Sequence, residues 1–131
     1  MIRIKLTSVM IDNQQKAKAF YTEKLGFSVK HDIPVGNGAS WLTVTTADDP
    51  DGVELLLEPM GGVAEAPGFQ KALYSAGIPA TAFGVDDIEA EYERLGKLGV
   101  TFRGAPSKAG PGPATVVLDD TCGNFIQLFQ L

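Results

Sequence analysis

The hydrophobic and polar positions of this chain follow the same order of periods twice. Residues 2–12, IRIKLTSVMID, have the β-branched content of a strand, and residues 13–27, NQQKAKAFYTEKLGF, have the 3.6-residue period of a helix. Residues 79–87, PATAFGVDD, and 88–100, IEAEYERLGKLGV, repeat that order. The apolar positions that share a helix face are Ala17, Phe20, Tyr21 and Leu25 in the first helix, and Ile88, Tyr92 and Leu95 in the second.

Each predicted helix has its own end signals and is followed by more strand-like segments. Asn13 is a predicted N-cap, and Gly26 and Gly99 are predicted helix stops. The strand-like segments are 27–35, 40–46 and 53–59 after the first helix, and 101–104, 113–120 and 124–131 after the second. Strand, helix and three strands therefore make one unit, and the chain contains two.

Two βαβββ units define the predicted organisation. The first covers residues 1–60 and the second 78–131, and a Gly- and Pro-rich linker, 61–77, includes a short helix around Phe69 to Ser75. Each unit is too small to bury its sheet face alone. We therefore expect a single α+β domain in which both repeats form a curved mixed sheet with a central cleft and helices on the convex side. A second Gly- and Pro-rich run, residues 104–114, is predicted to be a mobile loop.

Composition and charge narrow the range of partners. The formal charge of -5 and the pI near 4.7 disfavour nucleic acid and anionic membranes, and favour a cationic ligand. No apolar run approaches the length of a membrane span. The lone Cys122 cannot form an internal disulfide, which favours a reducing cytoplasm. No P-loop, nucleotide-binding Gly pattern or Ser-centred elbow is present.

Three segments carry a resemblance to a known family: FYTEKLGF at 20–27, DPDGVELLLEP at 49–59 and DTCGNFIQL at 120–128. Together with the duplicated βαβββ pattern, they resemble the vicinal oxygen chelate superfamily, which includes glyoxalase I, extradiol dioxygenases, fosfomycin-modifying enzymes and bleomycin-resistance proteins. The resemblance covers nearly the whole chain. It implies the fold much more specifically than the reaction, because that family supports many chemistries on one scaffold.

The resemblance also implies where a metal would bind. In metal-dependent members, ligands come from the first and last strands of each unit, and these positions fall on Leu6, Glu54, Ala80 and Gln127, with Glu54 and Gln127 as equivalents. Leucine and alanine offer no lone pair, whereas a divalent transition metal needs about three or more protein donors of nitrogen, oxygen or thiolate type. We therefore expect no catalytic metal.

A ligand-binding cleft is the remaining candidate site. Alternation places apolar and polar side chains of four strands toward the predicted cleft: Leu6, Ser8, Met10, Trp41, Glu54, Leu56, Gln127 and Phe129. No catalytic residue is identified. His31 and Glu58 are interpreted as exposed surface residues, and Cys122 as a turn residue.

The resulting hypothesis is a cytoplasmic homodimer that binds a small organic ligand, with a cationic one favoured, in an apolar cleft without a catalytic metal. Bleomycin-resistance proteins are the precedent that the resemblance implies. The alternative is a glyoxalase-like lyase or isomerase, or an extradiol-type dioxygenase, that uses Zn, Ni, Fe or Mn. A third hypothesis, a structural or regulatory partner domain, also remains open, so the sequence does not decide whether the protein is an enzyme.

Overall fold

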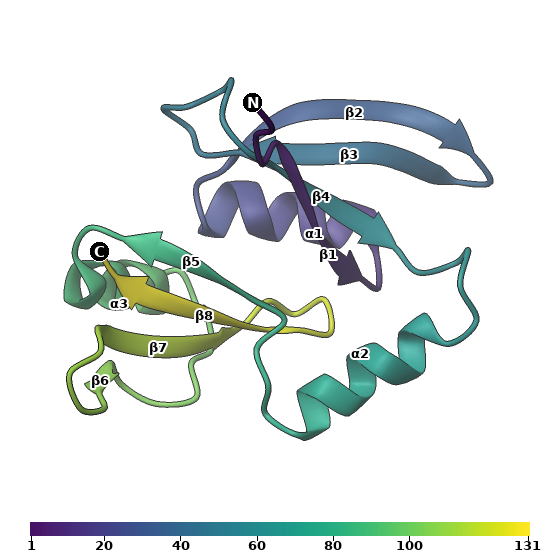
Figure 1. The fold of residues 1–131 in the computed structure, drawn as a ribbon. Coiled ribbons are helices and arrows are strands. Elements are labelled where there is room, and N and C mark those ends of the chain that lie inside the picture. The colour runs from purple at the N-terminus through teal and green to yellow at the C-terminus, as the bar shows by residue number, and fades with distance from the viewer. The chain divides into compact units, whose positions relative to one another are not determined.

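Two four-stranded sheets, each with a helix on one face, make up the computed structural model, which describes residues 1–131 (Figure 1). The chain divides into two units, here called the first module, Met1–Gly68, and the second module, Phe69–Leu131.

The first module contains six elements: β1 (Leu6–Ile11), α1 (Gln14–Ala19), η1 (Phe20–Lys24), β2 (Ser28–Gly36), β3 (Ala39–Thr45) and β4 (Glu54–Pro59). Its strand order is β1-β4-β3-β2. The β1–β4 pair is parallel, and the other two pairs are antiparallel.

The second module has the same strand order with different lengths. Its elements, together with α2 at the junction, are α2 (Ala66–Ser75), β5 (Thr81–Val85), α3 (Ile88–Lys97), β6 (Ser107–Lys108), β7 (Ala114–Asp119) and β8 (Phe125–Gln130). The sheet order is β5-β8-β7-β6, again with one parallel pair, β5–β8. The predicted α+β fold built from two βαβββ repeats is confirmed, and α2 begins at Ala66 rather than at Phe69.

The helix patterns predicted from the sequence form the core of each module. Ala17, Phe20 and Tyr21 are buried in the first, and Ile88 and Leu95 in the second. Asn13 caps α1, since its side chain accepts a hydrogen bond from the Lys16 amide at 2.9 Å. The predicted stops are confirmed as well, because Gly26 and Gly99 both have a φ of 85°, in the left-handed region that glycine adopts most easily.

The first predicted helix departs from a regular α-helix at its C-terminal half. Residues Phe20–Lys24 form the π-helix η1, and the Leu25 amide bonds back to the Phe20 carbonyl at 3.2 Å. The wider turn keeps Phe20 and Tyr21 both buried although they are adjacent in sequence. Their rings meet edge to face, with centroids 5.7 Å apart.

Two predicted strands differ from the structure. β1 starts at Leu6 and not near Ile2, because its partner β4 begins at Glu54, which pairs with Leu6, so residues 1–4 have no strand beside them. The segment 101–104 is not a full strand: Phe102 makes an isolated bridge to Leu118. The fourth strand is instead the two-residue β6, which lies within the run predicted as a mobile loop.

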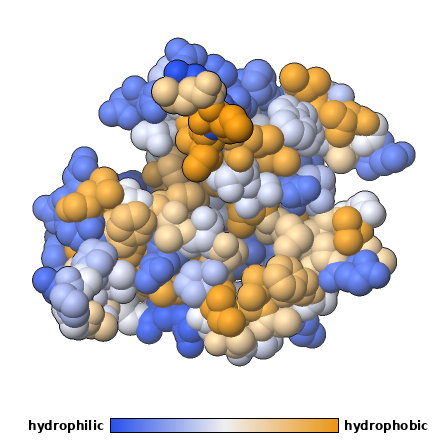
Figure 2. Space-filling view, in the orientation of Figure 1, coloured by the Kyte–Doolittle hydropathy of each residue, from blue (hydrophilic) through white to orange (hydrophobic).

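Apolar surface remains around the edges of both modules. Figure 2 shows hydrophobic residues over the N-terminal segment, the β2–β3 end and α2. The exposed large apolar side chains in these regions include Ile2, Ile4, Ile33, Val35 and Phe69. No helix reaches the length and hydrophobicity that crossing a membrane would require.

Candidate functional site

One face of the first sheet gathers six of the predicted site residues. In the β1–β4 register, Leu6 lies beside Glu54 and Ser8 beside Leu56. The alternate residues of these strands are buried on the side that packs against α1: Val9, Ile11, Leu55 and Leu57. The opposite side is here called the Glu54 face, and it includes Leu6, Ser8, Met10, His31, Trp41, Thr43, Glu54, Leu56 and Glu58.

Strand β3 contributes the middle of the Glu54 face. Thr43 pairs with Leu56 of β4, so it points to the same side, and Trp41, two residues earlier, does as well. Thr43 is fully buried, whereas Trp41 is 38% exposed. The predicted set from the sequence thus includes Trp41 but misses Thr43, which a simple apolar-cleft criterion overlooks.

His31 joins this face through an irregularity in β2. The register shifts between Val29, which pairs with Val44, and His31, which pairs with Thr43. This bulge lets the His31 side chain point to the same side as Thr43. His31 is interpreted from the sequence as an exposed surface residue, and its side chain is 40% exposed, but its Nε2 atom also lies 3.6 Å from Oε1 of Glu54. Strict alternation from the sequence contains no signal for such a bulge.

Glu54 is the charged centre of the face. Its side chain is 22% exposed, and its Oε1 atom accepts a hydrogen bond of 2.7 Å from the Thr43 hydroxyl. Oε2 has no hydrogen-bond partner within the protein, and no lysine or arginine pairs with this carboxylate. A partly desolvated charge with one free oxygen favours a donor from outside the chain.

In the second module, Gln127 and Phe129 lie on the sheet face opposite α3. They alternate with Ile126 and Leu128, which are buried. Gln127 pairs with Ala82 of β5. Phe125, at the start of the same strand, shares the face of Gln127 and Phe129.

The ring of Phe125 is already in contact with side chains of its own module. Its ring stacks on that of Tyr74 with centroids 4.2 Å apart and an interplanar angle of 6°, and the Arg103 guanidinium carbon lies 4.8 Å from its centroid. The Tyr74 hydroxyl donates to Oδ2 of Asp119 at 2.5 Å. This hydrogen bond is the main cause that raises the pKa of Tyr74 above its ordinary value, with smaller contributions from desolvation and the Asp119 charge.

The expected equivalence of Glu54 and Gln127 is wrong. Glu54 is the first residue of β4 and follows Gly52 by two positions, and Phe125 is the first residue of β8 and follows Gly123 by two positions. Phe125 is therefore the counterpart of Glu54, and Leu56 is the counterpart of Gln127. The sequence comparison was shifted by two residues, a shift that preserves the face and so leaves the hydrophobic pattern unchanged.

The residues present do not fit a divalent metal. Nowhere do three or more His, Cys, Asp or Glu side chains come together as a metal-binding group. Of the four positions implied by the resemblance, Leu6 adjoins Glu54 but has no donor atom. Ala80 has no donor side chain either. Its amide bonds to the Phe125 carbonyl at 2.8 Å, and it precedes Ala82, the partner of Gln127, by two residues on the same strand face.

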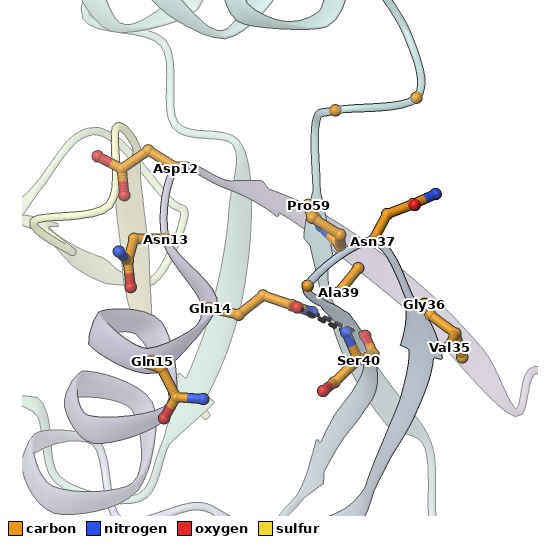
Figure 3. A pocket seen from close by; sticks show the side chains of 13 residues that line it. Asp12, Asn13, Gln14, Gln15, Val35, Gly36, Asn37, Ala39, Ser40 and Pro59 are labelled. Atoms are coloured by element: carbon orange, nitrogen blue, oxygen red, sulfur yellow. Dashed lines mark hydrogen bonds between the residues drawn. The ribbon is translucent and has the colours of Figure 1, made fainter.

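A separate groove of about 650 Å³ lies at the N-terminal end of α1 (Figure 3). The hydrophobic pattern of the chain does not indicate this groove. Its polar side chains mostly serve the fold: Gln14 exchanges hydrogen bonds of 2.8 and 2.9 Å with the Ser40 backbone and donates to the Leu57 carbonyl, and Asp12 pairs with Lys16. Gln14 and Asp12 are therefore engaged within the first module and are not free for a ligand.

Comparison with known families gives one match over most of the chain. The model of the Glyoxalase/Bleomycin resistance protein/Dioxygenase superfamily matches residues 3–128. The uncharacterized protein YurT of Bacillus subtilis (strain 168) is 50% identical over 129 residues, which are 98% of this chain and 99% of YurT.

Solved structures of similar fold agree with that match. The crystal structure of UcmS2 is 36% identical, with a TM-score of 0.83 over 100% of this chain and 99% of that one. TnmS3, described as an antibiotic binding protein from Streptomyces sp. CB03234, is 27% identical, with a TM-score of 0.72 over 99% of this chain and 96% of TnmS3.

Proposed function

Since the chain belongs to the Glyoxalase/Bleomycin resistance protein/Dioxygenase superfamily, we propose that it is a binding protein for a small organic ligand and that it works without a catalytic metal. The observation that carries this proposal is the Glu54 face. It combines apolar side chains with the carboxylates of Glu54 and Glu58, and it lacks the donor set that the metal-dependent chemistries of the family need.

The similarity to TnmS3, an antibiotic binding protein, supports a ligand-binding role. Leu6, 47% exposed, offers apolar contact area next to Glu54, and Ser8 and Met10 extend the same strand. Trp41, 38% exposed, adds apolar area farther along the same face. We include Gln127 and Phe129 of the second module in the proposed binding set. The net charge of -5 favours a cationic ligand over an anionic one.

We further propose a cytoplasmic homodimer. Cys122 is buried and forms no disulfide, which is compatible with a reducing compartment. Exposed apolar residues along the N-terminal segment, Met1, Ile2 and Ile4, would gain from coverage by a second copy. Sedimentation as a strict monomer at micromolar concentration would contradict the dimer and leave the ligand-binding proposal standing.

A second candidate function is an enzyme of the same superfamily, a lyase or isomerase of glyoxalase type or an extradiol-type dioxygenase. The contact between His31 and Glu54 favours it, because imidazole and carboxylate are both common metal donors and proton carriers. Two donors fall short of the three or more that a catalytic Zn, Ni, Fe or Mn centre takes from protein, which places this candidate second.

Elemental analysis of the purified protein, together with native mass spectrometry, tests the choice. A co-purifying organic compound without stoichiometric metal is the result expected for a binding protein. Calorimetric titration with Zn²⁺ completes the test, and we expect binding no tighter than that of a surface carboxylate. Tight binding of one Zn²⁺ per chain would overturn the metal-free proposal and move the enzyme to first place.

A further inference from the structure

Only one of the two carboxylate oxygens of Glu54 has a contact within the protein. Oε1 receives the Thr43 hydroxyl at 2.7 Å and has His31 Nε2 at 3.6 Å, whereas Oε2 has neither kind of contact. Because both contacts fall on the same oxygen, they fix the carboxylate group and leave its second oxygen unpaired on the Glu54 face.

The basic residues near this carboxylate are engaged elsewhere. Lys5 donates to the carbonyls of Asp51 and Gly52, Lys30 pairs with Asp51, and Lys18 pairs with Asp32. His31 is the one basic side chain in contact with Glu54. No lysine or arginine of the module pairs with the charge of Glu54.

We infer that Glu54 recognises an ammonium group of an aromatic or apolar ligand through Oε2, and that Thr43 and His31 are positioning residues that hold Oε1. This inference rests on the proposed binding function and names its ligand class. An ammonium group supplies N–H donors and the missing positive charge, which makes a charge-assisted hydrogen bond stronger than one from a neutral hydroxyl.

The neighbours of Glu54 favour an apolar body for that ligand. Leu6 lies beside Glu54 in the parallel register, and Leu56 follows Glu54 by two residues on the same face. Trp41 lies farther along that face, because β3 runs antiparallel to β4 with Thr43 beside Leu56. A ligand with an ammonium group next to an apolar ring system therefore matches the charge and the surface beside Glu54.

Two matched probes test this inference: 1-naphthylmethylammonium and 1-naphthylmethanol, which share a ring and differ in the donor. Isothermal titration of the full chain at pH 8 should show the ammonium probe binding about tenfold more tightly, as expected for one charge-assisted hydrogen bond. Glu54→Gln should abolish this preference. Glu58→Gln, the same change on the same strand and face, should keep most of it.

Variants of the positioning residues separate the orientation of Glu54 from folding. Thr43→Val should reduce the preference for the ammonium probe, and Thr43→Ser, which keeps the hydroxyl, should retain it. His31→Gln should reduce the preference by a smaller factor than Thr43→Val, because His31 lies 3.6 Å from Oε1 and the Thr43 hydroxyl 2.7 Å from it. An equal loss of affinity for both probes would show that His31 has only a structural role.

Each contrary result has its own meaning. If both probes bind the wild type equally well, the ammonium inference is wrong and the binding proposal stands. If Glu58→Gln removes as much preference as Glu54→Gln, general negative charge and not Oε2 makes the selection, and the inference is again wrong. If neither probe binds at millimolar concentration, the apolar binding face is wrong, and the inference fails with it.

Discussion

The same backbone position carries opposite chemistry in the two modules. Glu54 begins β4 and Phe125 begins β8, each two residues after a turn glycine. Glu54 is a carboxylate with one oxygen unpaired, whereas Phe125 is stacked on Tyr74 and contacted by Arg103. The duplicated fold thus has an equivalent position in both modules. At this position, only the first module presents a polar group to a ligand.

The turns before these two strands also differ in how far their polar side chains are buried and hydrogen-bonded. In the first module, Asp49 is exposed, and its turn is closed by a backbone bond from Gly52 to the Asp49 carbonyl. In the second, Asp120 is fully buried and accepts hydrogen bonds from the amides of Cys122 and Asn124 and from the Asn124 side chain. The polar groups of this second turn are therefore satisfied within the module, where they hold the start of β8.

The largest expected effects are in the helix cores, which should be alike in both modules. Phe20→Ala should lower the free energy of unfolding by about 4 kcal/mol, and Leu95→Ala by about 3 kcal/mol, through lost transfer energy and a cavity. Both side chains are buried against their sheets. Urea unfolding measures the change.

Leu98→Ala is the matched control for Leu95→Ala, because Leu98 is 40% exposed at the end of the same helix. Its loss should stay below about 1 kcal/mol. Near-wild-type stability of Phe20→Ala would show that the first helix does not pack as described.

The turns should behave differently from each other. Asp120→Ala should destabilise the protein by about 3 kcal/mol, because it leaves two buried amides without an acceptor. Asp49→Ala, the corresponding change in the exposed turn, should stay within about 0.5 kcal/mol of the wild type. Equal losses in thermal or urea unfolding would remove the contrast between the two turns.

The sequence predicted the backbone better than the side-chain partners. Helices, their ends at Asn13, Gly26 and Gly99, and most strands follow from hydrophobic periods and local signals, because these depend on near neighbours. The face of Glu54 was also predictable from alternation. Its contacts were not, since the bulge that places His31 beside Glu54 arises from pairing between strands.

The mistaken match between Glu54 and Gln127 has a similar physical origin. A shift of two residues along a strand changes neither the face nor the apolar pattern, so periodicity cannot detect it. The pairing register, with Leu6 beside Glu54 and Ala82 beside Gln127, separates the two positions, as does their different spacing from the turn glycines Gly52 and Gly123. The predicted strand at 101–104 was wrong for a related reason, because a short run of residues with strand propensity does not ensure continuous pairing with a neighbouring strand.

A smaller effect is expected where α2 is attached to the second module. The buried Gln70 side chain donates to the Cys122 carbonyl at 3.1 Å and to Oδ1 of Asn124 at 3.3 Å. Gln70→Ala should cost about 2 kcal/mol by leaving these acceptors unpaired. The exposed neighbour Lys71 provides the control, and Lys71→Ala should have little effect on urea unfolding.

The smallest effect concerns Tyr74, and it appears as a pH dependence. The hydrogen bond to Asp119 raises the Tyr74 pKa in the folded state, so folding favours the protonated phenol. This contribution is complete below the unfolded value, about pH 10, and is lost as pH rises through the higher folded value. Urea unfolding at pH 8 and at about pH 10.5 should therefore show a larger loss of stability for the wild type than for Tyr74→Phe.

Tyr92→Phe is the matched control in the same module, because the Tyr92 ring contacts Phe102 and its hydroxyl makes no hydrogen bond to the protein. It should keep the wild-type pH dependence. If Tyr74→Phe keeps that dependence as well, the Tyr74–Asp119 bond does not persist in solution. Phe125 would then be less firmly held by its own module, and the contrast with Glu54 would weaken, because the second strand start would also be open to a ligand.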